Sequence, residues 1–122
     1  MIFLFVSVKV TPKKRFEFEQ TMESLMEDLR TARGCLDYSV FRDYKNPNTF
    51  CIINKWQEKI NFINHIKTDS FGILMGAIAN LCEEDLLEIT LTTSSQDLTE
   101  MELALRKQLS NTIHIKSEAD IE

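Results

Sequence analysis

The chain has 122 residues and a net charge of −5, and its 14 lysines and arginines are scattered along the sequence. This length suits one domain with a single core, and shares of 43% hydrophobic and 27% charged residues are typical of a soluble globular protein. Because nucleic-acid binding usually needs a basic stripe, the charge pattern argues against a nucleic-acid partner.

The apolar residues 1–10 are too short to span a bilayer, and they lack the charged start and small-residue cleavage site of a signal peptide. We therefore expect no membrane partner. Cys35, Cys51 and Cys82 have the spacing of neither a disulfide framework nor a metal site, so no metal ligand set is expected. A reducing cytoplasm is the predicted location, with the cysteines as small core residues.

Residues 2–10 predict a first strand that is apolar on both faces. Phe3 and Phe5 lie on one face, and a set of branched aliphatic residues lies on the other: Ile2, Leu4, Val6, Val8 and Val10. A strand of this kind is expected at the centre of a sheet with both faces covered.

A helix is predicted to begin at Thr11-Pro12, with Thr as the cap and Pro in the first helical position. One apolar stripe follows at helical spacing, formed by Phe18, Met22, Leu25, Met26, Leu29 and Ala32. Gly34 comes after this stripe and is expected to end the helix in the left-handed conformation.

Two strand-like segments, Leu36–Tyr44 and Thr49–Trp56, flank a turn at residues 45–48 and predict a hairpin. The helical pattern after Trp56 carries His65, so the hairpin and helix should bring Trp56 and His65 to the same end of the sheet. Thr68-Asp69-Ser70 predicts a bend that divides this pattern into two helices.

A fourth strand is predicted over Leu86–Thr92, which completes a β-α-β-β-α-β order. This order predicts an α+β, ferredoxin-like fold with an antiparallel sheet and helices on one face only. The other face is partly apolar, and a wide apolar face usually meets a partner. We therefore expect a homodimer joined sheet to sheet.

The remaining residues 94–122 are expected to form a helical extension and tail beyond a domain of residues 1–93. Asp97 and Glu100 resemble a capping box, and the helix has a narrow apolar stripe, Leu98, Met101, Leu105 and Leu109. Because the domain already has its helical layer, this stripe is predicted to pack across the dimer. The tail, Ile113–Glu122, is alternating at first and acidic later, and its end is predicted to be disordered.

An ordered set of residues between Gly34 and Phe71 resembles the antibiotic biosynthesis monooxygenase domain, the small dimeric family that includes quinol monooxygenases. The set comprises Gly34-Cys35-Leu36, Tyr38, Arg42-Asp43, Asn46-Pro47, Phe50, Trp56, His65 and Ser70-Phe71. The resemblance covers roughly residues 2 to 92 and implies a dimeric α/β barrel. The sequence departs from the family in having Asn54 where Glu is usual, and in the helix after Thr92.

The resemblance implies an enzyme that inserts oxygen from dioxygen into a quinol-like or phenolic aromatic substrate, with no cofactor. His65, Trp56 and Asn54 are then the predicted catalytic residues. His has a suitable unperturbed pKa for proton transfer near neutrality, and Trp offers a flat wall and an N–H donor. Contacts with the substrate are predicted for Tyr38, Phe62, Phe71 and Ser7.

Each of these residues also has a structural interpretation. A single His at a helix boundary is often only a packing residue, a Trp at a strand end usually belongs to the core, and Tyr38 and Arg42 share an undetermined strand face. Two other functions remain open on the same fold. One is a haem-binding or haem-degrading relative, although Ser7 stands where those relatives tend to carry Asn. The other is a non-enzymatic dimeric binding or regulatory module.

Overall fold

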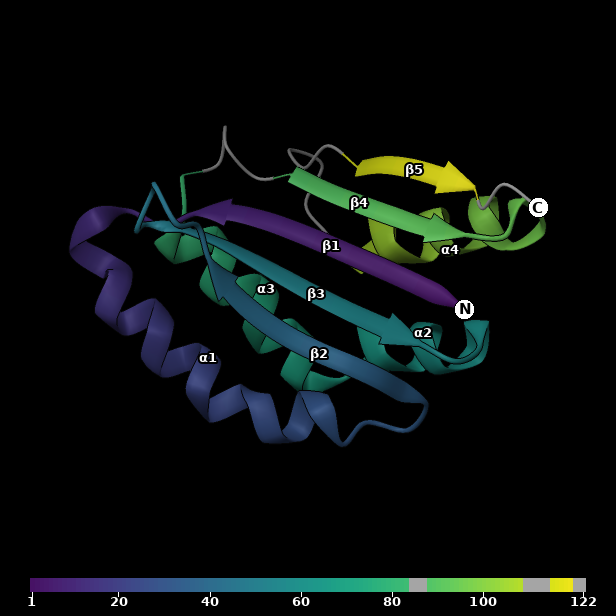
Figure 1. Ribbon diagram of the computed structural model, residues 1–122. Coiled ribbons are helices and arrows are strands. Elements are labelled where there is room, and N and C mark those ends of the chain that lie inside the picture. Colours follow the sequence, from purple (N-terminus) through teal and green to yellow (C-terminus); the bar gives the residue numbers. More distant parts are fainter. Residues whose placement is uncertain (84–87, 109–114, 120–122) are drawn as a thin grey trace.

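The structure, a computed structural model, describes residues 1–83, 88–108 and 115–119, and consists of one sheet with helices beside it (Figure 1). In chain order its elements are β1 (Ile2–Lys9), a 3₁₀ turn (Pro12–Lys14), α1 (Arg15–Arg30), β2 (Cys35–Arg42), β3 (Thr49–Trp56), α2 (Lys59–Ile66), α3 (Asp69–Leu81), β4 (Glu88–Thr93), α4 (Ser95–Gln108) and β5 (Ile115–Ala119).

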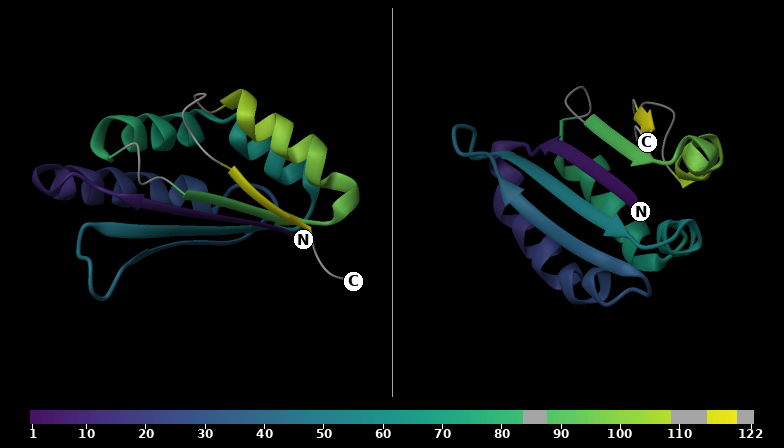
Figure 2. Two further views of the ribbon diagram at one scale, coloured as in Figure 1. Left: turned by 90° about the horizontal axis from the view of Figure 1, so that it is seen from above. Right: turned by 45° about the vertical axis from the view of Figure 1, so that its right-hand side comes forward.

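The five strands lie in the order β2-β3-β1-β4-β5. β1 pairs antiparallel with β3 and β4, and β2 pairs antiparallel with β3, so the first four strands have the predicted ferredoxin-like arrangement. The helices cover one face, as the view from above in Figure 2 shows. The predicted α+β fold is therefore confirmed, and the sheet of the single chain is open.

The two faces of β1 differ as the alternating sequence predicts. Phe3, Phe5 and Ser7 lie on the face away from the helices and are only partly buried. The alternate side chains point into the core beneath the helices and are buried, as is Val10 just after the strand: Ile2, Leu4, Val6, Val8 and Val10. β1 is central, as expected, but in the single chain only one of its faces is covered.

α1 and the turn that follows it agree closely with the sequence. Its buried residues are four members of the predicted stripe, Phe18, Met22, Leu25 and Leu29. Gly34 has φ of +80°, the left-handed conformation expected of it. Thr11 precedes the 3₁₀ turn and makes no side-chain capping bond, so the α-helix begins at Arg15, later than predicted.

The predicted bend between the two middle helices is present. Thr68 ends the link between α2 and α3, and its Oγ1 accepts a hydrogen bond from the Phe71 backbone N–H at 3.2 Å. α2 is therefore only eight residues long and has a different axis from α3 (Figure 1).

The sheet has a fifth strand that was not predicted. β5 pairs parallel to β4 within residues that were expected to be a tail with a disordered end. Parallel neighbours need a crossover connection, usually a helix, and α4 supplies it here. The sequence did show alternation at Ile113 and Ile115, but polar residues such as Lys116 and Glu118 weakened it. The end of the tail, 120–122, lies outside the described residues.

α4 packs on its own chain, against α2 and β4. The prediction that its stripe packs across a dimer is wrong for Met101 and Leu105, whose side chains are 0% and 1% exposed in the single chain. The helix begins at Ser95, before the predicted cap at Asp97. Leu109 lies outside the described residues.

We expect Gly34→Ala to destabilise the fold. A Cβ at this position would overlap the side chain of Asn61, and the positive φ is itself unfavourable for Ala. The loss should exceed about 1 kcal/mol in urea unfolding. Gly76→Ala is the matched control: a Cβ there meets nothing within 4 Å on α3, so this change should stabilise by roughly 0.5–1 kcal/mol. Equal unfolding midpoints for the two variants would contradict this account of the turn.

Candidate functional site

The site begins with two side chains at the end of β3. Asn54 and Trp56 are two residues apart on the helix-facing side of the sheet and are both buried. α2 starts at Lys59, where Glu58 and Asn61 form a reciprocal capping box. This short connection folds α2 back over the strand end. His65 consequently stacks on Trp56, with ring centroids 4.4 Å apart and an interplanar angle of 26°.

Tyr38 joins this cluster from the neighbouring strand. β2 pairs with β3 so that Tyr38 lies opposite Asn54, and its side chain points under the helices. Its Oη lies 3.4 Å from His65 Nε2, and its ring meets Trp56 edge-on. Arg30 Nε donates a hydrogen bond to the Tyr38 carbonyl at 3.0 Å, which ties the edge strand to α1.

The remaining predicted residues divide into two groups. Phe71, at the start of α3, meets His65 edge-on with ring centroids 5.1 Å apart. Phe62 is fully buried one helical turn before His65 on α2. Ser7 is not brought to this site, because the alternation of β1 puts it on the opposite face, across from Cys51. The sequence could not indicate which face of the strand would meet the helices.

Burial determines the charge state of the cluster. His65 is 3% exposed, and this desolvation lowers its pKa from 6.5 to about 4. Burial also raises the pKa of Tyr38 well above its usual value of 10. At pH 7 the site therefore contains a neutral imidazole beside a neutral phenol.

Only one of the two polar atoms of the Asn54 side chain is hydrogen-bonded within the described residues. Its Oδ1 accepts a hydrogen bond of 2.6 Å from the Trp56 indole N–H. Its Nδ2 is buried and has no hydrogen-bond partner within the part of the chain that the structure describes. A buried donor without a partner is costly, so a ligand oxygen or a water is a natural acceptor at this point.

A cavity of about 310 Å³ reaches His65 from the side of α1 and α2. Most of the residues that line it have polar side chains: Asp28, Ala32, Arg33, Asn61, Asn64, His65 and Thr68. Apart from His65, none of these residues was predicted, because their polar side chains at helix ends look like ordinary surface positions. The cavity can admit a molecule that carries several hydrogen-bonding groups.

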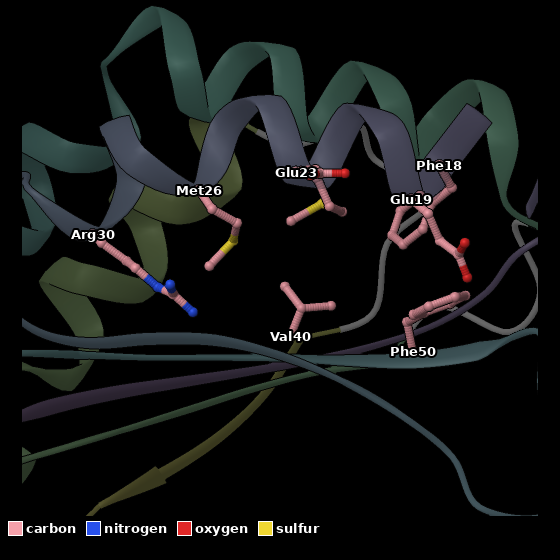
Figure 3. A pocket seen from close by; sticks show the side chains of 8 residues that line it. Phe18, Glu19, Glu23, Met26, Arg30, Val40 and Phe50 are labelled. Atoms are coloured by element: carbon pink, nitrogen blue, oxygen red, sulfur yellow. The ribbon is translucent and has the colours of Figure 1, made fainter. Parts of the chain in front are cut away.

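A second cavity, of about 240 Å³, lies between α1 and the hairpin strands and does not include His65 (Figure 3). Met26 and Val40 lie in its middle, with the Arg30 guanidinium at one end and Phe50 at the other. Met22 also lines it. Its charged lining residues are Glu19, Glu23 and Arg30, and no histidine of the described residues lines it.

The described residues contain neither a cluster of metal-ligating side chains nor a membrane-spanning helix. No three His, Cys, Asp or Glu side chains in these parts of the chain lie close enough together to hold a metal ion. Within the same residues, no helix has both the length and the apolar character needed to cross a membrane.

We expect the stability of the protein to fall between pH 6.5 and pH 4 because of His65. In this window the unfolded chain binds a proton at His65 that the folded chain excludes, so the free energy of unfolding decreases by up to about 3 kcal/mol. His65→Phe keeps a flat ring on Trp56 but cannot titrate. Urea unfolding at pH 7, 5.5 and 4.5 should therefore show a shallower decline for His65→Phe than for the unmodified protein. Identical declines would contradict the burial of a neutral imidazole.

Comparison with known proteins shows which family this chain belongs to. The sequence model of the family described as antibiotic biosynthesis monooxygenase matches residues 1–73. YcnE of Bacillus subtilis (strain 168), a candidate monooxygenase, is 34% identical over 71 residues, which are 58% of this chain and 75% of YcnE.

Solved structures of similar proteins have the same fold. A conserved protein from Methanosarcina mazei Go1 is 26% identical with a TM-score of 0.68, covering 74% of this chain and 88% of its own. A crystal structure of an antibiotic biosynthesis monooxygenase, 24% identical, has the same fold with a TM-score of 0.68 over 75% of this chain and 95% of its own. Since the family model covers more than half of the residues, the chain belongs to the antibiotic biosynthesis monooxygenase family.

Proposed function

We propose that this protein is a cofactor-independent monooxygenase that oxidises a quinol-like or phenolic aromatic substrate with dioxygen. The observation that carries the proposal is the buried, neutral His65, stacked on Trp56 and within 3.4 Å of the Tyr38 hydroxyl, at the end of a cavity. Membership in the family supports the reaction class, and the substrate class rests on the chemistry of these residues.

The reaction needs a substrate that supplies its own electrons. A quinol that loses a proton becomes an electron-rich anion, which can pass an electron to dioxygen. Recombination of the two radicals then forms a carbon–oxygen bond. One oxygen atom remains in the product and the other leaves as water, so that quinol and dioxygen give hydroxyquinone and water, with all four electrons coming from the substrate. The protein has only to bind, orient and deprotonate the substrate.

His65 is the proposed base or hydrogen-bond partner for the substrate hydroxyl. In the tautomer that donates its Nε2–H to the Tyr38 oxygen, Nδ1 carries the free lone pair. The lowered pKa of His65 makes full proton transfer unfavourable in the empty site. A phenolate formed beside the ring would offset this, because an adjacent negative charge favours the imidazolium.

Two other side chains of the site, Asn54 and Trp56, act beside His65. The free Nδ2–H of Asn54 can donate to an anionic oxygen in a buried site, where such a bond is strong. Trp56 is fully buried and stacks on His65, so it orients the imidazole, and its N–H is already used by Asn54. The polar side chains that line the cavity suit a ring that carries several hydroxyl or keto groups.

We also propose that the protein is a homodimer joined through the face of the sheet that the helices leave uncovered. This face carries half-buried or exposed apolar side chains from three adjacent strands: Phe3, Phe5, Phe41, Cys51 and Ile53. An uncovered apolar patch of this kind commonly marks an interface. The helix-covered site would lie on the far side of each sheet from the partner.

We expect dioxygen consumption with at least one member of a panel of reduced benzoquinones and naphthoquinones. His65→Ala should lower the rate at least about 100-fold, because a positioned base contributes roughly 100- to 10,000-fold. Tyr38→Phe is the control, since it keeps the ring but removes the hydroxyl near Nε2, and it should cost less than His65→Ala.

Full activity of His65→Ala would remove His65 as the base. No dioxygen uptake with any quinol would contradict the proposed function. In that case a Soret shift on titration with haemin would indicate a haem-binding relative, and its absence would favour a binding module.

We expect light scattering at micromolar concentration to give twice the chain mass of 14.2 kDa. Ile53→Glu puts a charge in the middle of the uncovered sheet face and should shift the mass toward that of one chain. Ile73→Glu, the same change at an exposed position on α3, should leave the mass unaltered. A folded monomer for the unmodified protein would contradict the proposed interface.

A further inference from the structure

α2, the helix that carries His65, is too short to hold its own position. It has eight residues, and isolated helices of this length are not stable in water. Successive residues of a helix are about 100° apart, so His65 lies about 200° around the helix from Ile63. One side of α2 therefore faces Trp56 and Tyr38. The opposite side carries Lys59, Ile63 and Lys67 and faces away from these rings.

α4 contacts α2, and its contacts with Lys59 and Ile63 put it on that opposite side. Lys59 Nζ, at the start of α2, is 2.9 Å from Glu100 Oε2 and 3.4 Å from Asp97 Oδ1 on α4. Further along, the two helices together line a surface hollow formed by Ile63, Lys67, Glu100, Leu103, Ala104 and Lys107. The contact thus runs along the helix from Lys59 to Lys67.

The anchor of α4 is apolar. Met101 is 0% exposed and Leu105 is 1% exposed, and both lie in the hydrophobic core of the protein. These two buried side chains fix α4 in the core, and the Lys59 ion pairs join it to the start of α2. The family model ends at residue 73, so α4 is outside the part of the chain that it matches.

We propose that α4 is a positioning element for His65: through Met101 and Leu105 it supports the back of α2 and holds the imidazole against Trp56 and Tyr38. The proposal rests on the proposed function only for its effect on activity. The contact between Tyr38 Oη and His65 Nε2, at 3.4 Å, is already near the limit of a hydrogen bond, so a small outward shift of α2 would break it.

The test compares Met101→Ala with Met22→Ala. Both remove a buried methionine side chain, but Met22 lies on α1 and lines the cavity beneath that helix instead of supporting α2. The first readout is the pKa of His65 by NMR, and the chain has two histidines, so His65→Phe assigns the signal. In Met101→Ala, water admitted around α2 should raise the pKa of His65 from about 4 toward 6.5. In Met22→Ala it should stay near 4.

The second readout is hydrogen exchange, which reports local opening. Met101→Ala should accelerate exchange of the α2 amides more than exchange of α1 and α3. If the quinol reaction is found, its kcat should fall by up to about 100-fold with little change in KM, because misplacement by about 1 Å can cost that much. An unaltered pKa of His65 together with unaltered α2 exchange in Met101→Ala would overturn the proposal. If the pKa and exchange of Met101→Ala change as expected but no quinol is oxidised by the unmodified protein, only the proposed function is overturned.

A milder pair of variants decides the question if Met101→Ala does not fold. Lys59→Glu puts like charges together at the Asp97 and Glu100 contact and should also speed α2 exchange. Combining Lys59→Glu with Glu100→Lys restores one opposite-charge pair and should return exchange toward that of the unmodified protein. Exchange that is unchanged in Lys59→Glu, or not rescued in the double variant, would overturn the role of the contact.

Discussion

The stacking of His65 on Trp56 is the interaction on which the site depends. It buries an imidazole that would otherwise titrate near pH 6.5 and keeps it neutral down to about pH 4. A histidine in water could exchange its proton with any solvent molecule. Here the aromatic neighbours of the ring within the described residues are Trp56, Tyr38 and Phe71, and the cavity beside it is the natural route to a proton donor.

Three layers of structure maintain this stack. β3 presents Trp56 and Asn54 on one face, and the Asn54 side chain fixes the indole through a 2.6 Å hydrogen bond. The capping box at Glu58 and Asn61 starts α2 immediately after the strand. α4, which is anchored by the buried Met101 and Leu105, lies against α2. It lies beyond residue 73, where the match to the family model ends.

Much of this could be predicted, because it depends on local patterns. Asn54 and Trp56 share a face by two-residue alternation, Thr68 breaks the helical pattern, and Gly34 adopts the left-handed turn. The predictions that were wrong concern features that depend on contacts between residues far apart in the sequence. The sequence of β1 is apolar on both faces, so nothing in it indicated that Ser7 would face away from the helices. The docking of α4 and the addition of β5 depend on tertiary packing, which a short amphipathic pattern does not specify.

The most direct test is to observe where a quinol binds. Under anaerobic conditions, a reduced naphthoquinone can be added to the protein and its contacts measured by intermolecular nuclear Overhauser effects. The account predicts effects from the ligand ring to the His65 imidazole and to Asn64 and Thr68 in the same cavity, and their loss in a variant with His65→Ala. Effects confined to Met22, Met26 and Val40, in the cavity beneath α1, would contradict it.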